Sequence, residues 1–162
     1  MWNKIKHKFS KKTKQCEDLS PDISDLHVNK INITPITYKH LIVDDSKTNR
    51  YVLSKYLERV GINVDEAIDG IECLEYVKKH DINYYDAIWM DIRMPKMDGM
   101  EATQQLRQTL CYKKYIIGLT GHVEVESRKQ CIKLGMNYII AKPILRNELY
   151  SLLYELFQIN SL

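Results

Sequence analysis

The sequence predicts an α/β fold, a doubly wound parallel sheet with (βα)5 architecture over residues 39–158. Five short apolar runs alternate with five stretches in which apolar residues recur at helical spacing. This alternation is typical of a parallel sheet whose two faces are covered by helices. The connections are short, which fits right-handed crossovers between successive strands. We found no internal repeat.

The expected strands are short apolar runs that end in polar or turn-forming residues. They are His40–Val43, Ile62–Ala67, Ala87–Met90, Tyr115–Leu119 and Tyr138–Ala141. Only the second run alternates between apolar and polar residues, as a half-exposed strand does. The others are apolar enough to be buried on both faces.

The expected helices carry apolar stripes with a period of about 3.6 residues. The stripes are Val52, Leu53, Tyr56, Leu57 and Val60; Ile71, Leu74 and Val77; Met100, Thr103, Leu106 and Leu110; the segment Glu124–Leu134; and Leu149, Leu152, Leu153, Leu156 and Phe157. Asp69 can cap the second helix. Gly61 and Gly135 suit positions just beyond helix ends.

Composition excludes several classes of protein. The chain has 162 residues, with 24 Lys and Arg against 21 Asp and Glu, a net charge of +3. That balance argues against a protein whose main work is to coat nucleic acid. No run approaches the ~18 apolar residues of a membrane span. The amino terminus lacks the apolar core of a secretory signal.

The positive charge is concentrated at the amino terminus. Residues 1–15 contain six lysines and no acidic residue, and residues 16–38 contain two prolines and a net negative charge. We interpret 1–38 as a flexible basic arm and linker, and 159–162 as a short tail. Trp2, Ile5 and Phe9 have helical spacing and could contact an anionic membrane, although a solvated tail is the simpler interpretation.

The cysteines indicate a reducing compartment. Cys16, Cys73, Cys111 and Cys131 form no C-x-x-C pair and no dense framework. We expect four reduced thiols and a cytoplasmic protein, with Cys73 and Cys131 packed as small apolar residues.

Polar residues follow four of the expected strands. Asp44 and Asp45 follow the first strand, Asp91 the third, Thr120 the fourth and Lys142 the fifth. In an open α/β sheet, ligands bind beyond the carboxyl ends of the strands, so these side chains should meet there. Three carboxylates in one pocket remain ionised together only beside a cation. An oxygen-rich site of this kind suits Mg²⁺.

Such a site can transfer a phosphoryl group. A divalent cation, the Lys142 ammonium and the Thr120 hydroxyl can each take one oxygen of that group. A carboxylate can then act as the nucleophile and form an aspartyl phosphate. Asp91 is the best candidate, because the third strand is central in the order 2-1-3-4-5.

Ordered motifs extend over nearly all of residues 39–158. They are Leu41–Asp45, Asp69–Glu72, Met90–Gly99, Gly118–Thr120, Gly135–Met136 and Ala141–Pro143. Together they resemble the receiver domain of two-component response regulators. Asn49-Arg50, Glu101–Thr103 and Leu119-Thr120 look most like receivers of hybrid histidine kinases and phosphorelays.

The resemblance implies a flavodoxin-like fold and a role for each site residue. Asp91 would accept phosphate from a phosphohistidine, Lys142 would contact the phosphoryl group, and Thr120 would move toward it. Mg²⁺ would be held by Asp45, Asp91 and the backbone carbonyl of Arg93, with Asp44 helping through water. Many receivers also have a cis peptide where this chain has Lys142-Pro143.

The resemblance also implies the partners. They are a histidine kinase or histidine phosphotransfer protein, and a downstream protein that contacts the last two helices and the last strand. No nucleic acid partner is expected, and the chain would catalyse only its own phosphorylation and dephosphorylation. No histidine lies in a phosphoacceptor context and no ATP-binding segment is present, so the chain cannot use ATP.

Three alternatives remain open. The chain could be the carboxyl-terminal receiver portion of a hybrid histidine kinase, although Met1 favours a free-standing protein. It could be a docking domain without phosphorylation, against which the complete acidic set argues. A Mg²⁺-dependent aspartyl phosphatase is disfavoured, because Arg93 stands where that family would have a second aspartate.

Two further positions carry expectations. His122 is interpreted as a loop residue, since no second His or Cys is spaced to share a metal with it. Many receivers have Tyr or Phe three residues before the last lysine, where this chain has Ile139. Tyr138 should point to the opposite face. The missing ring favours a phosphate relay over a switch that remodels a docking surface.

Overall fold

A computed structural model describes residues 37–121 and 125–159. In chain order its elements are β1 (Lys39–Val43), α1 (Lys47–Glu58), β2 (Asn63–Ala67), α2 (Gly70–Lys79), β3 (Ala87–Asp91), α3 (Gly99–Gln108), β4 (Tyr115–Thr120), α4 (Val125–Leu134), β5 (Tyr138–Ala141) and α5 (Arg146–Phe157). The arm proposed for residues 1–38 lies almost wholly outside the described residues, as does His122.

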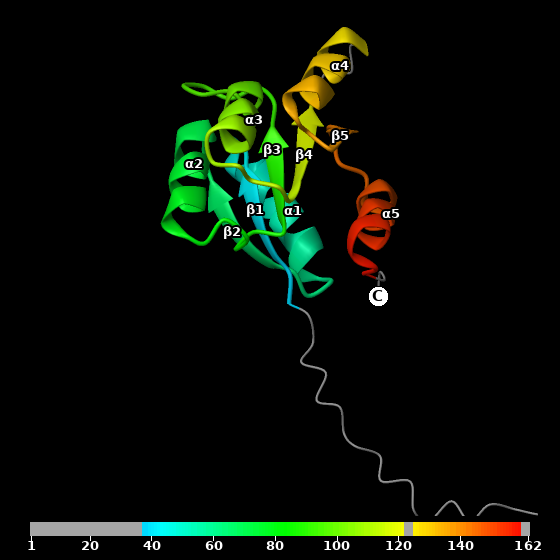
Figure 1. Cartoon of the computed structure of the whole chain (residues 1–162). Helices are drawn as coiled ribbons and strands as arrows, with labels where there is room; N and C mark the ends of the chain where they lie inside the picture. The colour runs from blue at the N-terminus through cyan, green and yellow to red at the C-terminus, as the bar shows by residue number, and fades with distance from the viewer. Residues whose placement is uncertain (1–36, 122–124, 160–162) are drawn as a thin grey trace, which may run out of the picture. The chain divides into compact units, whose positions relative to one another are not determined.

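The five strands form one parallel sheet in the order β2-β1-β3-β4-β5, as the sequence predicts. In β1, Val43 pairs with Ala67 of β2 and with Met90 of β3, so these three strands end side by side. Thr120 of β4 pairs with Ala141 of β5. The carboxyl ends of all five strands therefore lie along one edge of the sheet (Figure 1).

The helices cover the sheet on two faces (Figure 1). One core cluster joins α1 and α5 to the sheet through Leu53, Leu57, Leu149, Leu152 and Leu153. The other cluster joins α2, α3 and α4 to the opposite face, and it contains the two buried thiols Cys73 and Cys131. This is the doubly wound arrangement expected from the alternation of elements, and it has the flavodoxin-like strand order that the resemblance implies.

Local signals place the helix ends close to where the sequence predicts them. Ser46, Asp69 and Asp98 each accept a backbone N–H in the first turn of the helix that follows. Gly61 and Gly135 have φ values of 82° and 111°, a left-handed conformation that glycine adopts without strain. The peptide between Lys142 and Pro143 is cis.

Some sequence expectations are wrong in detail. The second strand starts at Asn63, because the backbone N–H of Ile62 donates to Leu57 at the end of α1. Leu110 lies beyond the end of α3. Val52 and Ile71 belong to the predicted apolar stripes but are exposed. These positions lie at the edge of a stripe, where the neighbouring element does not reach them.

Candidate functional site

Three aspartates meet at the carboxyl edge of the sheet. Asp44 and Asp45 directly follow β1, and Asp91 is the last residue of the adjacent β3. One carboxylate oxygen from each lies within 4.8 Å of the others. Asp44 is 1 % exposed and Asp91 6 % exposed, whereas Asp45 faces solvent. The predicted acidic cluster is therefore present, with the Asp45 carboxylate exposed to solvent and those of Asp44 and Asp91 buried.

Lys142 provides the positive charge that two of these aspartates need. It follows β5, and its Nζ lies 2.6 Å from Oδ2 of Asp44 and 2.8 Å from Oδ2 of Asp91. Burial by itself would lower the pKa of this ammonium, but the hydrogen bonds to Asp44 and Asp91 outweigh it and raise the pKa. Lys142 is therefore a charged donor shared between two buried acids.

Asp91 is held in an environment that disfavours its ionised form. Burial raises the pKa of the Asp91 carboxyl, and the hydrogen bond from Lys142 only partly offsets that rise. Oδ1 of Asp91 accepts a hydrogen bond from the backbone N–H of Arg93 at 3.3 Å. A carboxylate that is costly to ionise is stabilised by any further cation that binds beside it.

The first turn of α1 surrounds Asp44. The Ser46 backbone N–H donates to Oδ1 at 2.8 Å, and Asn49 Nδ2 contacts both carboxylate oxygens at 3.1 and 3.2 Å. Arg50 Nη1 donates to the Asp44 carbonyl oxygen at 2.7 Å, and its Nε pairs with Glu66 of β2 at 2.9 Å. Sequence reasoning assigned no role to Asn49 or Arg50. Their place four or five residues after Asp45, on a helix that starts there, was the available signal.

The loop after β3 is held closely against the site. Its Lys96 pairs with Asp69 at 2.9 Å, and the Gly99 backbone N–H donates to the Ile92 carbonyl oxygen. A Cβ at Gly99 would overlap the Asp91 carbonyl oxygen, so only glycine fits there. The backbone of residues 91–93 is therefore confined at the point where the predicted metal-binding carbonyl of Arg93 lies.

Two cavities border the acidic cluster. The larger, about 880 Å³, is lined by Asp91, Arg93, Thr120, Lys142 and Ile139, together with residues of α4. The smaller, about 250 Å³, lies between α1 and the loop after β5, and is lined by Asp44, Asn49, Val52, Lys142 and Ile144, among others. Lys142 borders both cavities, so it can reach a group bound from either side.

The sheet brings Thr120 to the same place. It is the last residue of β4 and is 7 % exposed, with Asp91 and Lys142 lining the same cavity. Each site residue predicted from the sequence thus lies at this edge, and three carboxylates offer the oxygen donors that a hard divalent cation prefers.

Within the described residues, no helix is long and apolar enough to cross a membrane.

Comparison with known proteins identifies the family. The model of the response regulator receiver domain matches residues 41–154. The chain belongs to the response regulator receiver domain family. This receiver is a phosphoacceptor domain of two-component phosphorelay signalling, and its acidic site is consistent with Mg²⁺-dependent aspartyl phosphorylation. Receivers are conventionally not catalytic enzymes, and they interact with histidine kinases and phosphotransfer proteins.

The receiver is similar to segments of much longer sensor kinases. It is 34 % identical over 138 residues to the osmosensing histidine protein kinase SLN1 of Saccharomyces cerevisiae, covering 83 % of this chain and 11 % of that protein. It is 38 % identical over 117 residues to hybrid signal transduction histidine kinase L of Dictyostelium discoideum, covering 68 % of this chain and 7 % of that one. The chain thus spans about a tenth of the length of these relatives.

A solved receiver shares both fold and sequence. The receiver domain of a sensor histidine kinase from Pseudomonas aeruginosa is 34 % identical, with a TM-score of 0.66 over 75 % of this chain and 98 % of that one. That structure has a magnesium ion coordinated in its active site cleft.

Proposed function

We propose that Asp91 accepts a phosphoryl group from a phosphohistidine of a partner protein and passes it on, or signals its presence, through protein contacts. One observation carries this assignment. Asp91 is a buried carboxylate at the end of the central strand. It lies 2.8 Å from Lys142 and lines the larger cavity. Asp44 is enclosed by α1, and Asp45 is open to solvent.

The transfer follows from these groups. An Asp91 carboxylate oxygen attacks phosphorus while the bond from phosphorus to the partner's imidazole nitrogen breaks, and the imidazole keeps the electron pair of that bond. The Lys142 ammonium contacts a phosphoryl oxygen and offsets the negative charge that develops there. The Thr120 hydroxyl moves toward the phosphoryl group and reports its presence. The chain catalyses only this reaction and the later hydrolysis.

The oxygen donors around Asp91 fit Mg²⁺. Asp45, the Asp91 carboxylate and the Arg93 backbone carbonyl would hold it, with Asp44 helping through water. When bound, the cation supplies charge that stabilises the phosphoryl oxygens in the transition state. The raised pKa of Asp91 supports this assignment, because a nearby cation would favour the ionised carboxylate that the reaction needs.

Ile139 supports a relay rather than a remodelling switch. It is buried in β5, where a Cβ on Gly118 would touch both it and Met136, so its side chain packs over β4 next to Met136. Tyr138 packs with the opposite core cluster, as its neighbouring position in a strand requires. An aliphatic side chain at this position offers no ring that could move between solvent and the cavity.

The relay interpretation has its own test. Backbone NMR with and without beryllofluoride should show changes concentrated at Asp91, Thr120 and Lys142. Large changes extending through Ile139 to Tyr154, together with tighter binding of a partner that has no phosphoacceptor histidine, would contradict it.

The proposed function requires two kinds of protein partner. A histidine kinase or histidine phosphotransfer protein would donate or take the phosphoryl group, and a downstream protein would contact α4, β5 and α5. Ile132 and Tyr154 are exposed on that surface. We propose residues 39–158 as the receiver of a cytoplasmic protein; the arm predicted for 1–38 lies almost wholly outside the described residues. The hybrid kinases among its relatives keep open that the chain is one segment of such a kinase.

Phosphorylation of the full chain by acetyl phosphate tests the assignment. With Mg²⁺, intact mass should rise by one phosphoryl group, and EDTA should prevent it. Asp91→Asn should abolish labelling, Asp45→Asn should weaken its Mg²⁺ dependence, and the exposed Asp81→Asn should label like the wild type. Undiminished labelling of Asp91→Asn would overturn the assignment of the phosphoacceptor.

A further inference from the structure

Asn49 makes a two-point contact with the most deeply buried carboxylate of the site. Its Nδ2 lies 3.1 Å from Oδ1 and 3.2 Å from Oδ2 of Asp44. The Ser46 backbone N–H provides another neutral donor, at 2.8 Å from Oδ1. Lys142 is the charged partner, at 2.6 Å from Oδ2. Asp44 therefore depends on two neutral donors and one cation.

The same cation is required elsewhere during phosphoryl transfer. Lys142 Nζ is shared between Asp44 and Asp91. A phosphoryl group on Asp91 would compete with Asp44 for the ammonium of Lys142, which already donates to both acids. A carboxylate that is 1 % exposed cannot replace its bond to Lys142 with water at little cost. The donors that remain on Asp44 then determine how readily Lys142 is released.

We propose that Asn49 is a positioning residue for phosphoryl transfer, acting through Asp44 on Lys142. Its amide orients the Asp44 carboxylate so that Lys142 reaches both acids, and it keeps Asp44 hydrogen-bonded when Lys142 turns to the phosphoryl group. This role rests on the proposed function of Asp91. It does not require Asn49 to touch the phosphoryl group or the metal.

Asn49→Leu removes the donor with little change in side-chain size. Without the amide, Asp44 should retain Lys142 more strongly. We expect the maximal rate of labelling by acetyl phosphate to fall about tenfold, since one hydrogen bond to a charged group is lost. Mg²⁺ affinity should change by less than about twofold, because Asn49 is not among the expected ligands. The affinity for beryllofluoride should fall together with the labelling rate, because this phosphoryl mimic also needs a contact from the Lys142 ammonium.

The neighbouring Thr48→Leu is the matched control. Thr48 and Asn49 are both exposed on the first turn of α1, so both variants should fold. Thr48→Leu should melt like the wild type, whereas Asn49→Leu should melt at a lower temperature because the buried Asp44 carboxylate loses a donor. Thr48→Leu should also keep the wild-type labelling rate. Equal rates and equal beryllofluoride affinities for the two variants would overturn the role of Asn49.

A double-mutant cycle separates positioning from a general structural effect. In an Asp44→Asn background no Asp44 carboxylate competes for Lys142, so adding Asn49→Leu should change the rate by less than about twofold. The same tenfold loss in both backgrounds would contradict the proposed route through Asp44. A wild-type chain that labels elsewhere than Asp91 would refute the proposed function, whereas beryllofluoride binding tests Asn49 without any phosphoryl donor.

Discussion

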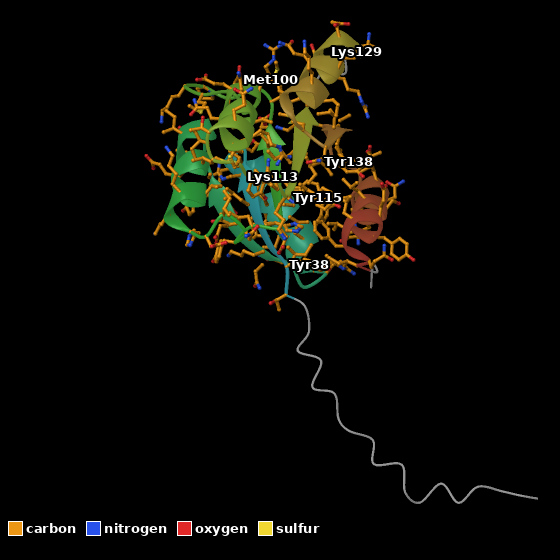
Figure 2. The ribbon with its side chains drawn as sticks, viewed as in Figure 1. Tyr38, Met100, Lys113, Tyr115, Lys129 and Tyr138 are labelled. Carbon is orange, nitrogen blue, oxygen red and sulfur yellow. The ribbon has the colours of Figure 1, made fainter. Side chains whose placement is uncertain are left out.

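The two ends of the sheet bury polar groups in opposite ways. At the carboxyl end, Asp44 and Asp91 share the ammonium of Lys142. At the amino end, His40 is 0 % exposed, and its Nδ1 accepts a hydrogen bond from Trp89 Nε1 at 3.1 Å. The Phe157 ring lies 5.0 Å from the His40 ring. In Figure 2, Tyr38 lies just before β1 at the amino end of the sheet, and Met100 lies in the first turn of α3 at the opposite end.

The difference is between charge and neutrality. Burial lowers the pKa of His40 to about 3, so the imidazole is neutral at pH 7 and packs as an aromatic residue. The pKa of Lys142 is raised above its ordinary value because two carboxylates surround it. The buried polar groups at the amino end of the sheet are therefore neutral and need no charged partner. The carboxyl end keeps buried charges that a phosphoryl group and a cation can rearrange.

Removal of Lys142 should have the largest effect on stability. Lys142→Met leaves the buried Asp44 and Asp91 without their cation, and losing one partner of a buried ion pair costs about 3 kcal/mol. Urea denaturation at pH 7 without Mg²⁺ should show that loss, and Mg²⁺ should restore part of it by binding the folded state.

The matched control is Lys114→Met. Lys114 pairs with Asp86 at 3.6 Å near the surface, so its loss should change stability by less than about 1 kcal/mol. Equal losses for the two variants would show that the carboxyl end does not depend on its buried ammonium.

His40→Gln should flatten the acid side of the stability profile. The folded pKa of about 3 is below the ordinary 6.5, so the unfolded chain binds more protons between these values. The stability that His40 contributes is fully present above pH 6.5 and falls as the pH drops, by about 2 kcal/mol at pH 5. Gln keeps an acceptor for Trp89 but does not titrate.

Urea denaturation of both proteins from pH 7.5 to pH 4.5 measures this difference, with ~0.2-unit control of pH. His80→Gln, at a half-exposed histidine, should keep the wild-type slope. A His40→Gln profile parallel to the wild type would show that the amino end tolerates a charge.

Asp91→Asn should produce the smallest change, and in the opposite direction. Because burial raises the pKa of Asp91, its ionised form at pH 7 carries a free-energy cost in the folded protein that a neutral amide avoids. We expect stability without Mg²⁺ to rise by roughly 1 kcal/mol. Asp81→Asn should leave it unchanged. Lower stability for Asp91→Asn would mean that the Asp91 pair with Lys142 is net stabilising.

The fold was predictable because its signals are local. Apolar runs, capping residues and glycines lie within a few residues of the elements that they define. The strand order was predicted from the doubly wound, flavodoxin-like fold, because short crossovers alone also allow other orders. The carboxyl edge was predictable for the same reason, since each polar residue directly follows its own strand. Exposure of Val52 and Ile71 was not predictable, because it depends on which neighbouring helix covers each stripe.

Contacts between distant segments needed the tertiary structure. Arg107 of α3 donates to the carbonyl oxygens of Tyr112 and Gly135 and to the Asn137 side chain, partners up to 30 residues away. Nothing in the local pattern around Arg107 distinguishes it from a solvated arginine. Its pKa is lowered by burial, which indicates how far the fold has enclosed it.

The sequence by itself determined the α/β fold, the edge of the sheet that holds the chemistry, and the acidic, basic and hydroxyl groups gathered there. Only the tertiary structure decided how those groups share their partners. Lys142 is 98 positions from Asp44, yet Lys142 Nζ lies 2.6 Å from an Asp44 carboxylate oxygen. The contact of Asn49 with Asp44 is local by contrast, because the first turn of α1 begins two residues after Asp45. Periodicity specifies which face a residue occupies, whereas hydrogen-bond partners depend on the packing of all five strands.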